Sequence, residues 1–211
     1  MKKIVISTVL LAFSFCLYGQ KLSADIMALS DACLAMRSAI GSGSLPQLRN
    51  ASEALSRCDA DPFRTIRCLD DSPLSLNGHF IFNQEFADSL VAGRQVYPFA
   101  QRYADRGMCS LSRGSGKTFY ASFAVCSGTS SRFSFASRGH QELVVITEPG
   151  GMVTLRVHDL SHDRWYNDTV DEKEGRPYRI LVFDLPKEIC TLELEVINTG
   201  AFDTSFVIIS N

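Results

Sequence analysis

From residue 119 onward, apolar residues recur at every second position in short runs, and this period constrains the fold of the chain more than any other feature. The pattern predicts seven strands, over residues 119–125, 133–135, 142–146, 153–157, 178–183, 192–196 and 206–209. Turn-forming residues such as Gly128, Pro186 and Gly200 separate them. Short alternating strands at this spacing favour an antiparallel β-sandwich, jelly-roll-like, with seven to eight strands. The intervals leave no room for crossover helices, so a parallel sheet is excluded.

The first part of the chain has a helical period instead. Its apolar residues recur at three- and four-residue steps, at Ile26, Leu29, Cys33, Met36 and Ile40. The glycines and serines of residues 41–44 end this helix, and Ser44 with Gln47 has the spacing of a capping box for a second one. A helical hairpin is therefore predicted over residues 20–60. Its apolar stripes are expected to pack against each other or against the following domain.

Residues 61–106 are predicted to be a mixed region that connects the hairpin to the sandwich. Pro62 and Pro73 lie in its polar first part and are typical of a connection. Residues 76–82 form a strand candidate, and residues 83–106 have apolar spacing compatible with helical turns. The sandwich itself is predicted over residues 107–211, so the expected class is α+β.

Residues 1–19 have the features of a secretory signal peptide: a basic start, an apolar run over residues 4–18 and a small residue, Gly19, at the expected cleavage point. The run is shorter than the roughly 20 residues of a spanning helix, so no transmembrane segment is expected after cleavage. Cys16 follows Phe15 and lacks the small residue that precedes a lipidated cysteine. The chain is expected to be exported, to the periplasm, the outer membrane or the medium. The Tyr-Gly-Gln ending of the leader resembles leaders of exported Bacteroidetes proteins.

The charge of the chain argues against two classes of partner. The formal net charge is −2, and it becomes −4 when a leader carrying Lys2 and Lys3 is removed. Nucleic acid and anionic lipid both call for clustered lysine and arginine, which a mildly acidic chain does not offer. Neither is an expected partner.

Six cysteines follow the leader: Cys33, Cys58, Cys68, Cys109, Cys126 and Cys190. In an exported chain an even count indicates disulfides, although six cysteines allow 15 pairings and buried thiols remain an alternative. In the predicted hairpin, Cys33 and Cys58 differ in axial position by about 9 Å. That offset exceeds the roughly 7 Å that a bridge spans, so the local pair Cys58 and Cys68 is the preferred prediction.

The stretch Ser-Arg-Gly-Ser-Gly-Lys-Thr at residues 112–118 ends like a phosphate-binding P-loop. A P-loop needs a glycine five residues before Gly116, and Leu111 stands there. It also needs a helix after the motif, whereas Thr118 leads into a strand pattern. A loop that enters the first strand of the sandwich is predicted instead, and no nucleotide cofactor is expected.

No catalytic motif is found elsewhere, and residues 158–168 form the best candidate binding loop. Its histidines and aspartates could hold a calcium ion through oxygen or a transition metal through imidazole, with candidate ligands His158, Asp159, His162 and Asp163. The alternation of the preceding strand directs His158 toward solvent. The only tryptophan also lies here, and a sugar or peptide could stack on a surface made by Trp165, Tyr166 and Asp168. An ordinary solvated loop with a packed tryptophan is the preferred interpretation, and the metal and stacking roles are the alternatives.

Residues 151–160, 178–186 and 191–210 resemble the bacterial pre-peptidase C-terminal domains, small sandwiches attached to secreted enzymes. The likeness is in a strand that ends in aspartate, a Leu-Pro before the penultimate strand, and an Asn-Thr-Gly turn into the last strand. It covers about half of the chain and implies a sandwich with an accessory or binding role. No protease domain accompanies it.

These observations predict an exported, non-catalytic binding or accessory module whose partner is a protein or a glycan of the cell envelope. One alternative is a secreted hydrolase whose catalytic residues converge from separate loops. The other is a structural envelope protein without a small ligand. The sequence does not determine the oligomeric state.

Overall fold

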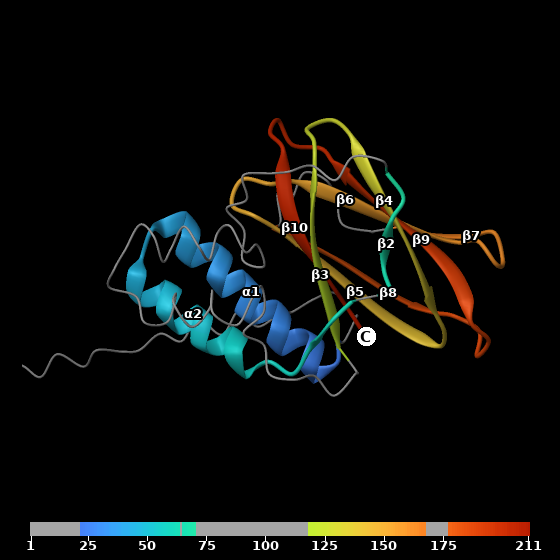
Figure 1. Cartoon of the computed structure of the whole chain (residues 1–211), viewed down its shortest axis with the longest axis horizontal. Helices are drawn as coiled ribbons and strands as arrows, with labels where there is room; N and C mark the ends of the chain where they lie inside the picture. The colour runs from blue at the N-terminus through green and yellow to red at the C-terminus, as the bar shows by residue number, and fades with distance from the viewer. Residues whose placement is uncertain (1–21, 64, 71–117, 168–176) are drawn as a thin grey trace, which may run out of the picture.

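The structure is a computed structural model that describes residues 22–63, 65–70, 118–167 and 177–211. A helical hairpin, α1 (Ala24–Ser42) and α2 (Leu45–Arg57), lies beside a two-sheet sandwich (Figure 1). The predicted α+β class is confirmed. The predicted leader, the strand candidate at 76–82, the helical turns at 83–106 and Cys109 all lie outside the described residues.

Each sheet has five strands. The first sheet has the order β1-β3-β10-β5-β8 and consists of β1 (Asp61–Pro62), β3 (Phe119–Val125), β10 (Thr204–Ser210), β5 (His140–Thr147) and β8 (Tyr178–Asp184). The second has the order β2-β4-β9-β6-β7 and consists of β2 (Arg67–Cys68), β4 (Ser130–Ser137), β9 (Cys190–Asn198), β6 (Val153–Asp159) and β7 (Arg164–Asn167).

Strands β3 to β10 have jelly-roll topology. Successive strands cross from one sheet to the other, except for β6 and β7, which form a hairpin within the second sheet. This places β10 between β3 and β5, and β9 between β4 and β6, as two interlocked Greek keys require. The predicted jelly roll is confirmed.

Two features of the sheets differ from the sequence prediction. The segment expected to be only a connection contributes β1 and β2, which pair with the edge strands β3 and β4. The β1–β3 pair is parallel, while the other described pairs are antiparallel. A two-residue strand carries no alternation, so the period of two could not indicate it.

The core between the sheets is filled by the inward positions of both. Phenylalanines pack at its centre: the Phe133 ring lies 4.3 Å from Phe123 and 6.0 Å from Phe206 between centroids. Thr118 is buried and leads directly into β3, as predicted for the end of the P-loop-like stretch, whereas residues 112–117 lie outside the described part.

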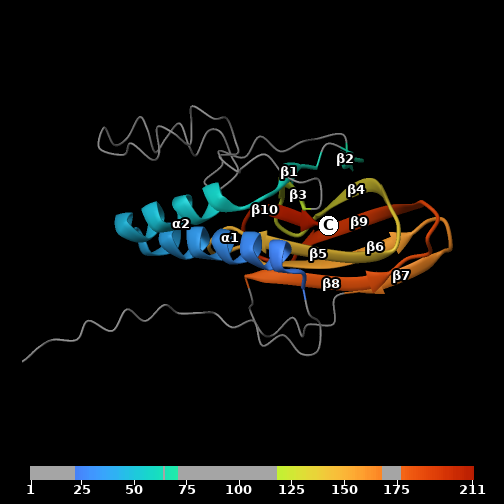
Figure 2. The same ribbon diagram turned by 90° about the horizontal axis from the view of Figure 1, so that it is seen from below.

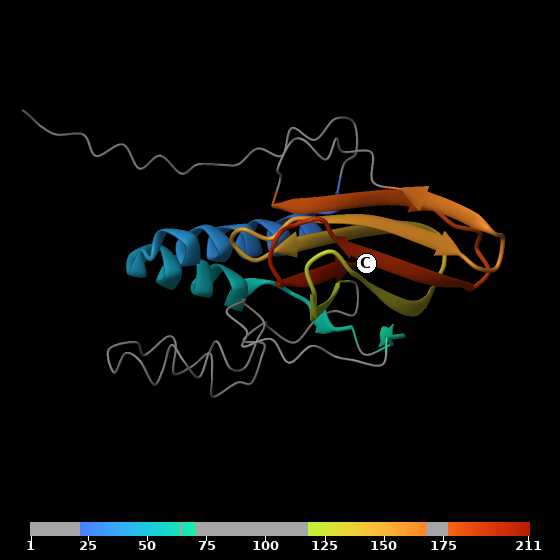
Figure 3. The same ribbon diagram turned by 90° about the horizontal axis from the view of Figure 1, so that it is seen from above.

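Helix α1 packs against the outer face of the first sheet at β5 and β10, and α2 packs on α1 (Figures 2 and 3). The stripe of α1 packs with outward residues of that sheet, including Val144, Ile146, Val207 and Ile209. Polar contacts fasten α1 at two places. Ser23 donates its backbone N–H and its hydroxyl to the carboxylate of Glu142, at 2.8 and 2.7 Å. Arg37 donates Nε–H to the carbonyl of Thr147 at 2.9 Å.

The junction of the two helices is partly as predicted. Gly43 ends α1 in the left-handed conformation, φ 64°, which glycine adopts without strain. Ser44 precedes α2 as expected, but its side chain makes no capping hydrogen bond. Gln47 instead accepts a hydrogen bond from the Ser42 hydroxyl at 2.9 Å, so the predicted capping box does not form.

The predicted disulfide between Cys58 and Cys68 is wrong in this structure, because the two cysteines are not bonded to each other. Cys58 is buried and donates its S–H to the carbonyl of Ala54, whereas Cys68 is exposed and points to the carbonyl of Asp70. Nearness in sequence was the basis of the prediction, and the chain places the two side chains in different environments. The other described cysteines, Cys33, Cys126 and Cys190, do not form disulfides either.

Candidate functional site

Residues 158–167 belong to a β-hairpin, which corrects the prediction of a loop. The β6–β7 pair opposes His158 to Trp165 and Asp159 to Arg164, so only residues 160–163 form the turn. Asp163 closes the turn at φ 51°, a left-handed conformation that aspartate tolerates better than most residues. Asp168, a candidate ligand-binding residue, lies outside the described residues.

Trp165 is held flat on the outer surface of this hairpin. Its ring stacks on the His158 imidazole, with centroids 4.2 Å apart and planes 6° apart. The Arg156 guanidinium lies 5.9 Å from the ring centroid, and His158 Nε2 is 2.8 Å from the Asp163 carboxylate. The tryptophan nevertheless remains 49% exposed. His158 points to the outer face as predicted, but the indole covers it.

The neighbouring outer face of the second sheet is polar. Alternating charges pair across its strands: Arg156 with Glu195 at 2.8 Å, and Arg132 with Glu193 at 3.8 Å and Asp70 at 3.6 Å. These groups are partly exposed, so each pair adds little to stability. Trp165 therefore lies at the edge of a partly exposed surface rich in hydrogen-bonding groups.

Tyr166 points away from that surface. Its ring stacks on Phe183 of β8 at 4.3 Å, and the Arg164 guanidinium lies 5.1 Å from it. The Tyr166 hydroxyl donates to the Asp184 carbonyl at 3.4 Å. Tyr166 thus connects β7 to the first sheet, while Trp165 carries the exposed aromatic surface.

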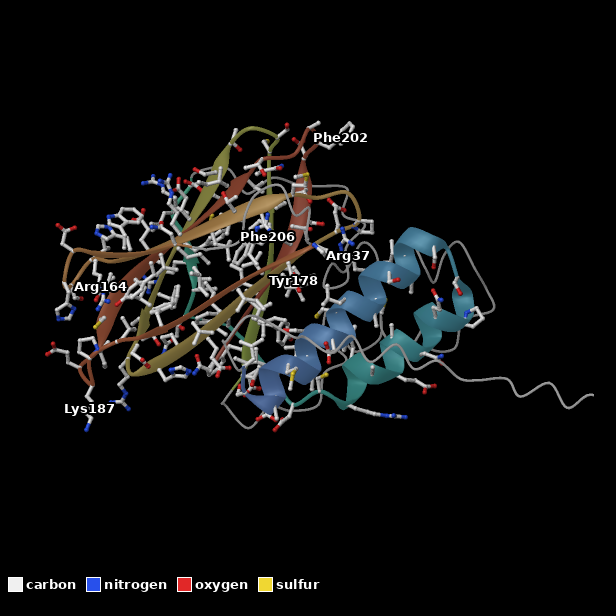
Figure 4. All side chains as sticks on the ribbon, turned by 180° about the vertical axis from the view of Figure 1, so that it is seen from behind. Arg37, Arg164, Tyr178, Lys187, Phe202 and Phe206 are labelled. Carbon is white, nitrogen blue, oxygen red and sulfur yellow. The ribbon has the colours of Figure 1, made fainter. Side chains whose placement is uncertain are left out.

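A second group of side chains converges at the turn of the hairpin. His162 Nδ1 lies 2.8 Å from Asp159 Oδ2 and 3.8 Å from Cys190 Sγ, and His162 Nε2 lies 3.2 Å from Glu188 Oε1. Asp159 and Cys190 are buried, and His162 caps them from the solvent side. The flanking residues Arg164 and Lys187 lie at the end of the sandwich away from the helices (Figure 4).

The protonation of this cluster follows from its carboxylates. The hydrogen bond to Asp159 raises the pKa of His162, and the charges of Asp159 and Glu188 act in the same direction. Burial raises the pKa of the Cys190 thiol, and both carboxylates add to this effect. Near neutral pH the Cys190 thiol of the metal-free cluster is therefore expected to be neutral, and the carboxylates favour the protonated form of His162 relative to an ordinary histidine.

The cluster is not arranged for nucleophilic catalysis. A catalytic histidine faces its nucleophile with one ring nitrogen and its carboxylate with the other. Here Asp159 and Cys190 share the same nitrogen, Nδ1. A buried thiol with a raised pKa is also a poor nucleophile, so these three residues do not form a catalytic triad.

The structure separates the four predicted metal ligands. Asp159 and His162 meet, whereas His158 and Asp163 pair with each other beside Trp165. Sequence reasoning missed Cys190 and Glu188, which lie 28 and 26 residues from His162. One sequence signal could have identified Cys190. It lies two residues before Leu192, the first apolar residue of the predicted strand, so the alternation of the strand directs its side chain into the sandwich.

No family model and no curated protein matches this chain. Solved structures that superpose on part of it include the pre-peptidase C-terminal domain of a collagenase from Bacillus anthracis, at 16% identity and a TM-score of 0.28, over 46% of this chain and 80% of that one. Another is PliG, a periplasmic inhibitor of g-type lysozyme from Salmonella Typhimurium, at 15% identity and a TM-score of 0.32, over 48% and 93%. The predicted resemblance reaches no further than a β-sandwich, and likeness at this level carries no function.

Within the described residues, neither helix is both long and apolar enough to cross a membrane.

Proposed function

We propose that the chain is an exported, non-catalytic binding module that recognises a component of the cell envelope through the surface around Trp165. The observation that carries this proposal is the exposed indole of Trp165, which stacks on the imidazole of His158. A large aromatic ring left half in water costs free energy unless something covers it. The predicted leader at residues 1–19 supports export.

The chemistry of the surface favours a glycan over a protein segment. The indole offers a planar apolar ring. Arg156 and Glu195 offer hydrogen-bonding groups next to it on the same face of the sheet. A sugar ring has one apolar face and a rim of hydroxyls, so it can use both at once. Protein partners more often need a wider apolar centre, which this charged face does not offer.

A hydrolase is the alternative class. The Cys190, His162 and Asp159 cluster is the nearest approach to a catalytic set among the described side chains, and its shared nitrogen offers no proton relay. Binding is therefore the function that the described geometry supports best.

The single tryptophan makes the proposal directly testable. A panel of envelope polysaccharide fragments is screened on an array, and each hit is titrated against the intrinsic fluorescence of the purified protein. Because Trp165 is the only tryptophan, a saturable change in the tryptophan emission reports binding at the indole. Trp165→Ala is expected to abolish binding in calorimetry and to leave the thermal midpoint nearly unchanged.

Phe202→Ala is the matched control, because Phe202 is an aromatic residue 78% exposed in the β9–β10 loop, away from the hairpin. It should bind like the wild type. The proposal is wrong if glycan binding survives Trp165→Ala, or if peptides bind at Trp165 and glycans do not.

A further inference from the structure

Three donor atoms of different chemistry converge at the end of the sandwich away from the helices. They are Asp159 Oδ2 from the end of β6, His162 Nδ1 from the hairpin turn, and Cys190 Sγ from the start of β9. All three lie within 4.8 Å of one another. Two of them come from rigid strands that are paired in the same sheet, because Asp159 lies opposite Leu192 in the β6–β9 ladder.

We propose that Asp159, His162 and Cys190 form a binding site for a divalent transition metal of the zinc class. In a tetrahedral zinc site, a nitrogen and a sulfur ligand lie about 3.6 Å apart, and a nitrogen and an oxygen ligand about 3.4 Å apart. The observed Nδ1–Sγ distance of 3.8 Å is close to the first value. The Nδ1–Oδ2 distance of 2.8 Å is that of a hydrogen bond, and it widens by about half an ångström when a metal ion replaces the shared proton.

Glu188 supplies an independent feature of a metal site. Its carboxylate lies 3.2 Å from His162 Nε2, whereas Asp159 and Cys190 face the other ring nitrogen, Nδ1. A metal-binding histidine typically donates its other N–H to a carboxylate, which fixes the orientation of the ring and makes the bound nitrogen more basic. Ser161 adds to this arrangement, since its backbone N–H donates to Asp159 Oδ1 at 3.0 Å and leaves Oδ2 directed at the cluster.

The donor set selects the class of metal. Calcium prefers six to eight oxygen ligands, and two of the three donors here are nitrogen and sulfur. A thiolate with an imidazole and a carboxylate suits zinc and its neighbours in the first transition series. His162 is 39% exposed, so water could reach a bound ion and supply a fourth ligand. The bound ion would join the β6–β7 turn to the loop before β9.

Cobalt(II) is the probe, because it is coloured in tetrahedral sites and a cysteine ligand adds a thiolate-to-metal charge-transfer band. The reduced, chelator-treated protein is titrated with Co²⁺ alone. We expect a charge-transfer band that saturates at one Co²⁺ per chain and disappears when Zn²⁺ is added. Absence of the band from the wild-type protein would overturn the proposal.

Variants assign the band to these residues. Cys190→Ser and His162→Ala are expected to remove it, and Glu188→Gln is expected to weaken binding by about 10- to 100-fold. Cys68→Ser, at an exposed cysteine outside the cluster, is the matched control and should keep the band. A band that survives His162→Ala, or that depends on Cys68, would contradict the site. His162 lies on an exposed turn, so its variant decides the matter even if Cys190→Ser fails to fold.

The proposal is independent of glycan recognition at Trp165. Trp165→Ala is expected to retain the Co²⁺ band, and His162→Ala is expected to retain glycan binding. If both variants lost both properties, the two sites would be one, and the metal site as proposed here would be wrong.

Discussion

The two sheets of the sandwich share one core but meet different surroundings on their outer faces. In the first sheet, every position of β10 and all but the first position of β5 are buried, because their outward apolar residues pack with α1 and their inward ones lie in the core between the sheets. In the second sheet, β6 and β9 alternate strictly between core positions and partly exposed ones. The first sheet is thus sandwiched between two apolar layers, and the second has one apolar side and one hydrated side.

The amino-acid sequences of the strands reflect this difference in burial. The runs Leu-Val-Val-Ile in β5 and Phe-Val-Ile-Ile in β10 have no polar position to present to water. Such continuous runs are typical of strands covered on both faces, whereas alternation is typical of strands with one free face. Among the described residues, the first sheet therefore carries the helices, and the outer face of the second sheet is the one on which binding is proposed.

The largest effect is expected when an outward-facing side chain is shortened in each sheet, which tests whether the two outer faces differ in burial. Ile209→Ala, beneath α1, is expected to lower the free energy of unfolding by about 2–5 kcal/mol, because the residue is fully buried. Ile197→Ala, on the outer face of β9, should cost less than about 1 kcal/mol. Urea denaturation measures both. Equal losses would mean that the helices do not cover the first sheet.

Thiol reactivity compares the covered interface with the edge of the second sheet. Burial raises the pKa of Cys58 to about 11, with a smaller contribution from Asp31, and burial together with Cys58 raises the pKa of Cys33 well above its ordinary value. At pH 8, a thiol with a pKa of about 11 has a thiolate fraction about 100-fold smaller than a thiol with a pKa of about 9. Alkylation with iodoacetamide at pH 8, followed by mass spectrometry, should modify exposed Cys68 at least about 100-fold faster than Cys58. Similar rates would show that the interface is open.

The contact between Ser23 and Glu142 tests how α1 is fastened to the first sheet. Glu142→Gln keeps the shape of the side chain but removes the charge that accepts the Ser23 N–H and hydroxyl. It is expected to lower the free energy of unfolding by about 1–3 kcal/mol, because the group is buried. Glu193→Gln, on the exposed face of the second sheet, is the matched control. A control that costs as much would show that burial is not the cause.

The end of α1 can be stabilised. A methyl group at Gly41 would meet only Pro149, at 3.7 Å, which is an ordinary contact. Gly41→Ala is expected to raise the free energy of unfolding by up to about 1 kcal/mol through helix propensity. Gly43→Ala should lower it instead, because Gly43 has φ 64°. Thermal melts of the two variants should therefore shift in opposite directions, and shifts of the same sign would contradict the docking of α1 described here.

The smallest effect is expected on the open face. Arg156→Ala removes the ion pair with Glu195, whose partners are partly exposed. The free energy of unfolding should fall by less than about 1 kcal/mol, and the loss should shrink at high salt. Denaturation at low and high ionic strength measures it. A large loss that salt does not change would mean that this face is packed and not free.

Much of the architecture was predictable from local pattern. The period of two located seven strands of the jelly roll, and the helical stripe located α1. Strand β7 was missed because its four residues, Arg-Trp-Tyr-Asn, lack an apolar alternation. Cross-strand pairing with β6 forms it, and Trp165 and Tyr166 are sorted to opposite sides only by that pairing.

Part of the candidate metal site was likewise predictable from local sequence, and part was not. Asp159 and His162 are three residues apart, so the sequence alone brought them to attention as possible ligands. Cys190 and Glu188 join them only because β6 and β9 are neighbours in a jelly roll, a pairing that depends on the closure of the whole sandwich.

Local pattern identified the seven longer strands, because the backbone of a strand alternates its side chains between two faces whatever the partner strand. Tertiary structure alone decided which outer face the helices cover, and which of the charged, aromatic and sulfur-bearing side chains meet. Those contacts depend on strand order and register, which arise from the packing of distant segments and leave no periodic trace in any one of them.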